Sequence, residues 1–188
     1  KIMKNLLNIF DSKKYLDLAL KNRKKYLRSK PFPHIYFDNF LPRKLAITLS
    51  KEYPKIKNVD KNWRVHKNEN VDRYFLEDSS LYKKNLKIFS MLVNSRKFLL
   101  FLETLTGVSS ILPDPFFIGG GAMTTGKGGF LNIHADFNYH HKLQSWRKIN
   151  ALFYLTPNWK KNWGGNLEFW SKNKKKKITE IEPLFNRV

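Results

Sequence analysis

A histidine and a carboxylate stand two positions apart in residues 128–136, which read G-G-F-L-N-I-H-A-D. In a β-strand, residues i and i+2 point to the same face, so His134 and Asp136 would aim an imidazole and a carboxylate at one volume. Such a pair supplies two of the three donors of a 2-His-1-carboxylate triad, which leaves open positions on Fe(II). The spacing alone is weak evidence, because a histidine and an aspartate at the end of a sheet are often simply hydrogen-bonded or solvated.

A second polar face follows in residues 147–155, R-K-I-N-A-L-F-Y-L, which predict the next long strand. Asn150, Leu152 and Tyr154 would share one face of that strand. The phenol of Tyr154 can donate a hydrogen bond to a carboxylate, whereas core packing explains Leu152 equally well. Residues 163–169, W-G-G-N-L-E-F, then turn the chain into a further strand, and the paired glycines permit a tight turn.

Together these three motifs resemble the prolyl 4-hydroxylase-like branch of the Fe(II)- and 2-oxoglutarate-dependent oxygenases. Residues 31–42, with P-F-P-H and D-N-F-L-P, look like that family's entry segment. The resemblance covers about residues 31–188 and is most specific over 128–169. It implies an α+β fold with a double-stranded β-helix (jelly-roll) core and supporting N-terminal helices. It also implies a dioxygenase that hydroxylates a C–H bond with Fe(II) and the cosubstrate 2-oxoglutarate, with ascorbate as a further candidate cofactor.

The resemblance assigns the metal ligands. His134 and Asp136 match the family's first two iron ligands, and they are also the candidate catalytic residues. The family's third ligand is a distal histidine, and a lysine or arginine after it binds the 2-oxoglutarate carboxylate. Both are expected beyond Val188. His140 and His141 follow in the next loop, where we expect them to flank the site or face solvent.

The resemblance also assigns cosubstrate contacts. Tyr154 matches a tyrosine that contacts the 2-oxoglutarate carboxylate, and Leu167 matches an apolar residue of the same pocket. Asn150 and Leu152 join them as candidate cofactor-binding residues on the shared inward face.

One glycine-rich segment resembles a phosphate-binding loop but does not meet its requirements. Residues 121–128, G-A-M-T-T-G-K-G, lack the Ser or Thr after the lysine that would hold magnesium. The segment also leads into a predicted strand, so no helix N-terminus is offered to phosphate. We interpret it as a connection into the first site strand, from which Met123 or Thr124 would line the cosubstrate pocket.

The elements that must position these residues fall into two regions of one predicted domain, residues 1–188. Residues 1–118 are expected to form a mainly helical support, and residues 119–188 part of the jelly-roll core. Hydrophobic periodicity, proline and glycine mark the elements. The predicted helices are residues 4–27, 43–53, 79 or 80 to 94, and 95–106; the predicted strands are 34–37, 129–136, 148–155, 166–170 and 178–181, with 54–77 irregular and 172–177 a solvated hairpin loop.

The composition limits the chemistry. The 188 residues include no cysteine, so disulfides and thiolate metal sites are excluded. A metal here must use His, Asp, Glu or water, which favours Fe(II), Mn(II) or Zn(II). The absence of a long apolar run argues against a membrane span or a membrane partner.

The formal net charge of +21, from 36 Lys and Arg against 15 Asp and Glu, leaves a second function open. A basic nucleic-acid- or ribosome-associated binding module on a jelly-roll scaffold, without catalysis, is the alternative. We do not favour it, because the lysines are scattered along the chain. The same charge would suit an acidic protein or small-molecule substrate, and a prolyl residue is the leading candidate. A cytoplasmic location is expected, although a chain that starts at Lys1 does not exclude a signal peptide.

Overall fold

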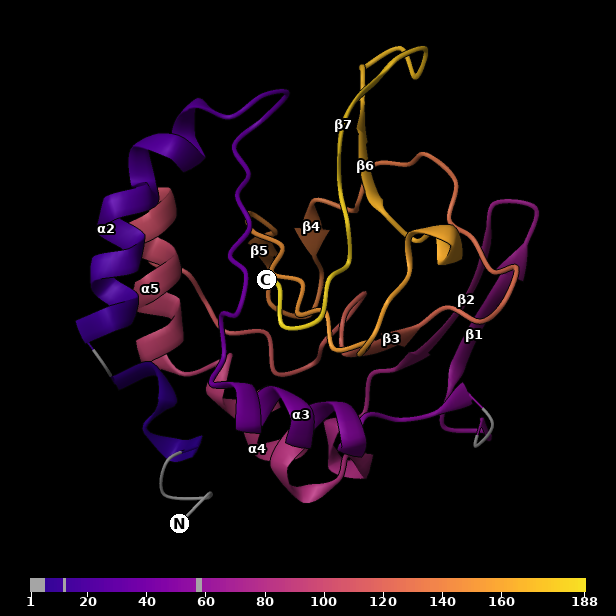
Figure 1. The fold of residues 1–188 in the computed structure, drawn as a ribbon, viewed down its shortest axis with the longest axis horizontal. Coiled ribbons are helices and arrows are strands. Elements are labelled where there is room, and N and C mark those ends of the chain that lie inside the picture. Colours follow the sequence, from indigo (N-terminus) through magenta and orange to yellow (C-terminus); the bar gives the residue numbers. More distant parts are fainter. Residues whose placement is uncertain (1–5, 12, 57–58) are drawn as a thin grey trace.

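The computed structural model describes residues 6–11, 13–56 and 59–188. These residues have a mixed α+β fold with four α-helices and small antiparallel sheets (Figure 1). The helices are α2 (Lys13–Arg28), α3 (Arg43–Glu52), α4 (Lys84–Leu92) and α5 (Arg96–Thr106), and the 3-10 turns are Ile9–Asp11, Ser79–Leu81 and Lys161–Trp163. The predicted helices 43–53 and 95–106 are confirmed within a residue. The other two predicted helices are shorter in the structure, because the 3-10 turns Ile9–Asp11 and Ser79–Leu81 take up part of their predicted ranges before α2 and α4 begin. Positions 4, 5 and 12 of the first prediction lie outside the described residues. Within the described ranges, no helix has both the length and the apolar character needed to cross a bilayer.

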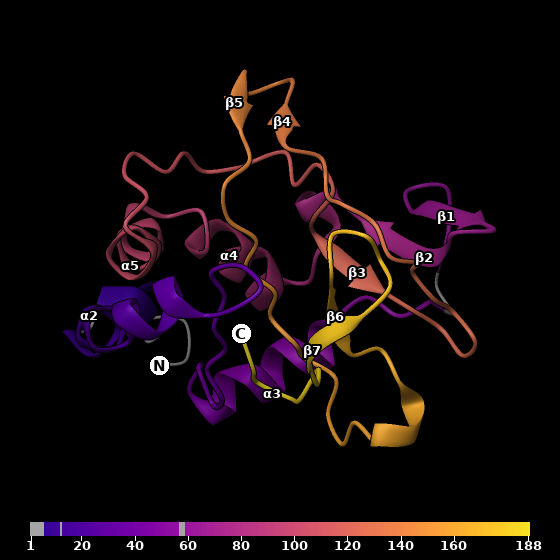
Figure 2. The same ribbon diagram turned by 90° about the horizontal axis from the view of Figure 1, so that it is seen from above.

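The hydrophobic core lies mainly among the helices. In Figures 1 and 2, α2 and α5 lie side by side. Tyr15 of α2 and Phe101 of α5 pack edge to face between them. Tyr15 of α2 is buried and its hydroxyl donates a hydrogen bond of 3.0 Å to the carbonyl of Phe40. Phe98 and Phe101 of α5, three positions apart on one helix face, pack with Phe40 in the same cluster. As predicted, α5 ends at a left-handed glycine, Gly107, with φ of 77°.

Backbone N–H groups at the N-terminus of α4 donate hydrogen bonds to a residue of another helix, α3. The carboxylate of Glu52, the last residue of α3, accepts the backbone N–H of Asn85 at 2.7 Å and that of Leu86 at 3.0 Å. These are N–H groups that lack a partner within their own helix, and a negative charge is favourable at that end. Glu52 therefore fixes α3 against α4.

In the part of the chain that the structure describes, the strands form three separate antiparallel sheets. They are β1 (Arg64–Asn68), β2 (Val71–Leu76) and β3 (Ala122–Thr124) in one sheet, β4 (Tyr139–His140) with β5 (Ser145–Trp146), and β6 (Leu167–Trp170) with β7 (Lys177–Ile181). The β6–β7 hairpin confirms the last two predicted strands and the lysine-rich turn between them. The prediction that residues 54–77 are irregular was wrong, because β1 and β2 form a hairpin there.

Two predicted site strands, 129–136 and 148–155, are extended but form no regular ladder. Each makes an isolated bridge, through Leu131 to Val71 and through Tyr154 to Arg187. Residues 34–37 were also predicted as a strand. Instead, Phe37 exchanges two backbone hydrogen bonds with Val188, at 2.9 and 3.1 Å, without a longer pairing.

These extended segments nevertheless lie together. The backbone of Tyr154 makes two hydrogen bonds to the C-terminal segment. Its N–H donates to the Arg187 carbonyl at 2.9 Å, and its carbonyl accepts the Asn186 N–H at 2.8 Å. The buried side chain of Asn186 bonds both backbone groups of Leu41. Residues 185–188 thus join the segment before α3 to the segment that carries Tyr154.

Candidate functional site

The site segment is positioned by β2. Residues 122–124 pair with β2, residues 125–129 bulge away, and residues 130–132 return to it. The return is marked by the Asp72 N–H donating to the Phe130 carbonyl at 2.9 Å and the Asn132 N–H donating to the Asn70 carbonyl at 2.8 Å. The chain then bends away from β2 and reaches His134.

Gly129 closes the bulge because only glycine fits there. A Cβ at this position would lie 2.8 Å from the carbonyl oxygen of Asp72 and 2.6 Å from a methyl carbon of Thr125. The Gly129 N–H also donates to the Gly126 carbonyl at 3.0 Å, which shapes the turn. The glycine-rich segment therefore serves close backbone approach to β2, in agreement with its interpretation as a connection into the site.

The imidazole of His134 is oriented by the backbone. Its Nδ1 lies 2.8 Å from the carbonyl oxygen of Asn132. Because a carbonyl only accepts hydrogen bonds, Nδ1 carries the proton, and the lone pair of the neutral ring is on Nε2. A carbonyl bonded to one ring nitrogen is the usual arrangement for a histidine whose other nitrogen binds a metal.

The carboxylate of Asp136 is oriented by two side chains. Its Oδ2 accepts a hydrogen bond of 3.0 Å from Nδ2 of Asn150 and lies 3.5 Å from Nη2 of Arg147. The same Arg147 nitrogen donates to Oδ1 of Asn150 at 2.8 Å, so the three polar groups form one network. The other oxygen of Asp136, Oδ1, is turned toward His134.

The two candidate ligands therefore present a nitrogen and an oxygen to one point. His134 Nε2 and Asp136 Oδ1 are 3.2 Å apart, and about half of each side chain is exposed. With Nδ1 protonated, two lone pairs face one another, and this arrangement requires a proton or a cation between them. The donor set fits two positions of an Fe(II), Mn(II) or Zn(II) site. Within residues 6–11, 13–56 and 59–188, no group of three His, Cys, Asp or Glu side chains could hold a metal ion.

Tyr154, like Asp136, lies near Arg73 of β2. Burial raises the pKa of its hydroxyl, while the positive charges of Arg73 and Arg187 act to lower it. The phenol is therefore a neutral hydrogen-bond donor at ordinary pH. Its neighbours Phe153 and Leu155 point the opposite way, into the helical core. The alternation predicted for this segment is thus retained: Asn150 and Tyr154 face Asp136 and Arg73, although no ladder forms.

Arg73, in the middle of β2, is a residue of this region that sequence reasoning missed. Burial lowers the pKa of its guanidinium, and the nearby Tyr154 and Asp136 oppose that effect. In the sequence V-D-R-Y-F-L it stands between Val71 and Phe75, which share its strand face and are both buried. A lone arginine at an inward position of an apolar strand was the signal that could have revealed it.

Leu152 and Leu167 are half-buried, as expected of pocket or core residues. Leu167 begins β6 opposite Ile181 of β7. The turn before it uses the paired glycines with positive φ, 66° at Gly164 and 81° at Gly165. Nε1 of Trp159 donates a hydrogen bond of 2.9 Å to the Gly164 carbonyl and holds that turn.

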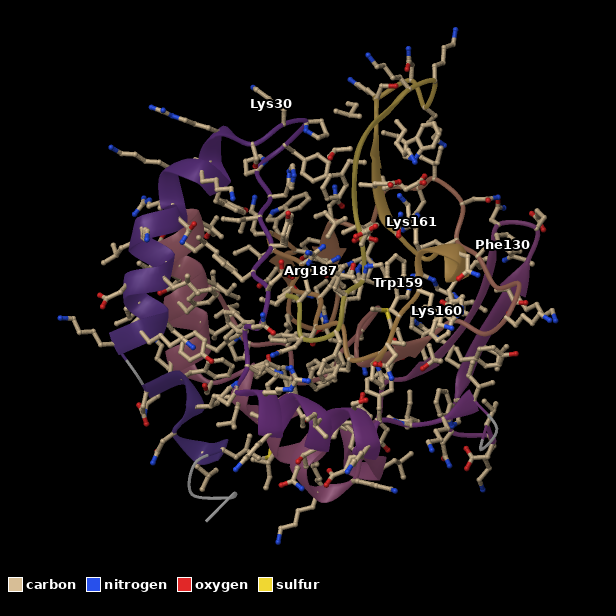
Figure 3. All side chains as sticks on the ribbon, in the orientation of Figure 1. Lys30, Phe130, Trp159, Lys160, Lys161 and Arg187 are labelled. Carbon is tan, nitrogen blue, oxygen red and sulfur yellow. The ribbon has the colours of Figure 1, made fainter. Side chains whose placement is uncertain are left out.

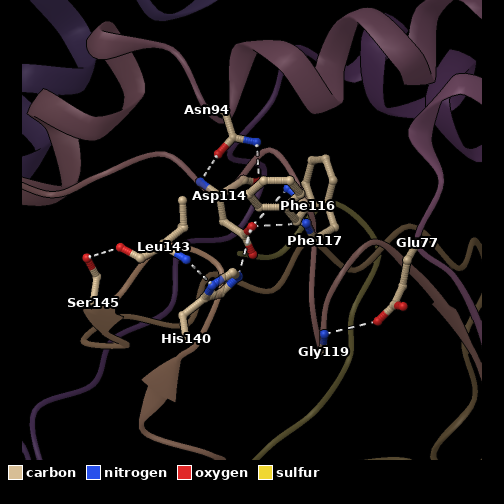
Figure 4. Close-up of polar contacts among 9 residues, drawn as sticks. All are labelled: Glu77, Asn94, Asp114, Phe116, Phe117, Gly119, His140, Leu143 and Ser145. Atoms are coloured by element: carbon tan, nitrogen blue, oxygen red, sulfur yellow. Dashed lines mark hydrogen bonds and ion pairs between the residues drawn. The ribbon is translucent and has the colours of Figure 1, made fainter.

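His140 does not flank the site as a free side chain. It is buried, its Nδ1 accepts the Leu143 N–H at 3.1 Å, and its Nε2 lies 3.3 Å from Oδ1 of Asp114 (Figure 4). The same Asp114 oxygen accepts the N–H groups of Phe116 and Phe117. The expectation for His140 was therefore wrong, because this ring ties the β4–β5 hairpin to the loop after α5. His141 is exposed, as expected.

The positive charge is spread over the surface. Figure 3 shows side chains with nitrogen at their tips projecting outward around the molecule, among them the exposed Lys30 at one edge and Lys160 and Lys161 before β6. Arg187, in contrast, lies in the interior and forms an ion pair with Asp38 at 2.7 Å.

Residues 120–188 match the family model of the 2OG-Fe(II) oxygenase superfamily and carry a domain of that superfamily. The matched region contains His134, Asp136, Asn150, Tyr154 and Leu167. No curated protein and no solved structure matches the chain. The family match indicates Fe(II)- and 2-oxoglutarate-dependent oxidation as the chemistry of this region, and it does not distinguish among the branches of the superfamily.

Proposed function

From the oxygenase-superfamily domain at residues 120–188, we propose that this protein is a dioxygenase that hydroxylates a substrate C–H bond at His134 and Asp136. The observation that carries the proposal is the 3.2 Å approach of His134 Nε2 to Asp136 Oδ1. Each side chain is also held by a second hydrogen bond, that of His134 to the Asn132 carbonyl and that of Asp136 from the Asn150 amide. A surface histidine and aspartate that met by chance would not need both of these supports.

The chemistry available at such a site couples two oxidations. Bound Fe(II) supplies O2 activation, and the overall reaction converts substrate R–H, 2-oxoglutarate and O2 into R–OH, succinate and CO2. One oxygen atom enters the product and the other enters succinate, so the reaction needs no further reductant.

The chain's own residues bind and orient. Nε2 of His134 and Oδ1 of Asp136 are the two donor atoms, while Asn150 and Arg147 keep the carboxylate from rotating. Tyr154 donates its phenolic hydrogen to a carboxylate of the cosubstrate, since its raised pKa keeps the proton on the oxygen. Leu152 and Leu167 contribute apolar pocket walls. The third metal ligand and a basic residue downstream of it stay predictions.

We further propose a prolyl residue in a protein as the substrate, as in the prolyl 4-hydroxylase-like branch, and a jelly-roll core around the site. The backbone hydrogen bonds of residues 37 and 154 to residues 186–188 support such a core, because they bring segments from both halves of the chain together. Ascorbate is the cofactor that would keep iron reduced. The surface charge of +21 would attract an acidic partner.

The proposal is tested by succinate formation from 2-oxoglutarate with Fe(II) and O2. We expect the wild-type protein to form succinate, and the His134→Ala variant to lose this activity. His141→Ala is the matched control, since that ring is exposed. Unchanged turnover in His134→Ala would contradict the assignment. Salt-dependent binding to RNA without any turnover would favour the nucleic-acid-binding alternative.

A further inference from the structure

The turn between β6 and β7 carries a concentrated positive charge. Residues 172–177 read K-N-K-K-K-K, and residues 169–179 contain no Asp or Glu. The hairpin projects beyond the rest of the molecule in Figure 1, and Figure 3 shows side chains tipped with nitrogen around its end. Most lysines of the chain are spread over the surface, so this gathering at one projecting point is a distinct feature.

The shape of the turn is set by Ser171 and Asn173. The Ser171 N–H donates to the Lys176 carbonyl at 2.8 Å, and the Ser171 hydroxyl oxygen accepts the Lys176 N–H at 3.0 Å. Oδ1 of Asn173 accepts the Ser171 hydroxyl at 2.7 Å and the Lys175 N–H at 3.2 Å. These bonds use the backbone of the lysines and not their side chains. The ammonium groups are therefore displayed by the turn without being needed to form it.

Lys177 contrasts with the other lysines of the turn, because it has acidic partners. Its Nζ lies 3.1 Å from Oε1 of Glu168 and 2.6 Å from Oε2 of Glu180, one on each strand of the hairpin. Among the residues that the structure describes, four exposed lysines of the turn have no ion pair: Lys172, Lys174, Lys175 and Lys176. Like charges this close repel one another, and a bound polyanion would relieve that repulsion.

An aromatic patch adjoins the lysine turn. The ring of Phe169 in β6 lies 4.7 Å from the rings of Phe32 and His34, which belong to the segment between α2 and α3. Phe32 is 50% exposed, so part of its ring is open to a ligand. Phe169 stands three residues before Lys172, about 10 Å along an extended strand. The exposed Lys30 precedes Phe32 by two residues, so cations flank the patch in both segments.

We propose that the β6–β7 turn and this aromatic patch bind a single-stranded nucleic acid. The four unpaired lysines neutralise backbone phosphates, and Phe32 stacks on a base. The open ring beside the lysines favours a nucleic acid over an acidic peptide, because every base has a π-face while a carboxylate needs only the cations. The surface uses neither His134 nor Asp136, so the proposal is independent of the oxygenase assignment and adds a second binding function to it.

The test follows the binding of fluorescently labelled oligo(dT) by anisotropy over a series of NaCl concentrations. In one variant, Lys172, Lys174, Lys175 and Lys176 are all replaced by Gln. We expect its affinity to fall about tenfold or more at low salt. The slope of log K against log salt should decrease by about 2 to 3, since each phosphate contact of a single strand contributes about 0.7.

The matched control removes the same charge from another surface. Lys13, Lys21, Lys24 and Lys25, all exposed on α2, are replaced by Gln. This variant should keep the wild-type slope and most of the affinity. An equal loss in both variants would overturn the proposal, because overall charge would then account for binding. Wild-type affinity in the variant of the turn would overturn it as well.

The role of the aromatic patch is tested with Phe32→Ala and two ligands, oligo(dT) and inorganic polyphosphate, which has no bases. We expect the affinity for oligo(dT) to fall about fivefold or more, because a stacked base is lost. Binding of polyphosphate should be unchanged, which also shows that the variant is folded. Equal affinities of wild type and Phe32→Ala for oligo(dT) would overturn the assignment to a nucleic acid. Tighter binding of poly-glutamate than of oligo(dT) would do the same and would indicate an acidic protein. Oligo(U), titrated in parallel, distinguishes RNA from DNA as the source of the strand.

Discussion

Asn150 holds Asp136 in place through a 3.0 Å hydrogen bond from its Nδ2 to Oδ2 of the carboxylate, although the two residues are 14 positions apart. The bond leaves Oδ1 free to face Nε2 of His134. The prediction that Asn150 is a cofactor-binding residue stays a prediction. Its hydrogen bond to the carboxylate gives it in addition a defined physical role, as a residue that positions a candidate metal ligand.

Replacing Asn150 should therefore weaken metal binding without removing a ligand. In Asn150→Leu the carboxylate is free to rotate, and we expect Mn(II) affinity to fall about 10- to 100-fold. The affinity is measured by Mn(II) titration. Asn162→Leu, at an exposed position, should bind Mn(II) like the wild type. Equal affinities of Asn150→Leu and wild type would show that the bond does not orient Asp136.

The Tyr154→Phe substitution tests the contribution of the Tyr154 hydroxyl to binding separately from its contribution to stability. The backbone bonds of residue 154 to Asn186 and Arg187 do not involve the hydroxyl, so we expect the melting temperature to change little. The affinity for 2-oxoglutarate should fall about tenfold, because a hydrogen bond to a carboxylate is lost. Equilibrium dialysis measures this affinity, with Tyr36→Phe as the control at an exposed tyrosine. An unaltered affinity for 2-oxoglutarate would show that the Tyr154 hydroxyl does not bind the cosubstrate.

Gly129→Ala should destabilise the protein, because the added methyl group meets the Asp72 carbonyl and Thr125. We expect a loss of about 2 kcal/mol or more in the free energy of unfolding, measured with urea. Gly128→Ala is the matched control. Nothing lies within 4 Å of its Cβ, but its φ of +77° is unfavourable for alanine, so about 1 kcal/mol should be lost. Equal losses would mean that the contact with β2 is unimportant.

Stability should fall at high pH because of buried tyrosines. Burial raises the pKa of Tyr15 to about 12, so the folded state keeps a proton that the unfolded chain releases near pH 10. The stabilisation by Tyr15 is thus complete below about pH 10 and lost progressively up to about pH 12. Tyr15→Phe should be less stable than wild type at neutral pH, and the difference in melting temperature should shrink above about pH 10. A difference that is constant with pH would contradict this account.

The helices were predictable because their signals are local. The spacing of Phe98, Phe101 and Leu105 and the stop at Gly107 are contained in α5 itself. The β1–β2 hairpin was missed for the same reason. β1 is mostly exposed and reads R-V-H-K-N, so its pairing with β2 cannot be recognised from its own composition.

The site was predictable only in part. The i, i+2 spacing brought His134 and Asp136 together correctly even though their segment is not a regular strand. The partial burial of Arg73 depends on folding β2 against residues 130–132, which is a long-range contact. The burial of His140 likewise depends on Asp114, which lies in another loop. Sequence periodicity carries no information about such contacts.

The central claim is that His134 and Asp136 hold a divalent metal ion, and pulsed EPR of bound Mn(II) tests it most directly. Coupling of a histidine nitrogen to Mn(II) should be present in the wild type and in His141→Ala, and absent in His134→Ala. Asp136→Ala should lower the affinity, because an oxygen donor is lost. Nitrogen coupling that persists in His134→Ala, with unchanged affinity, would contradict the account.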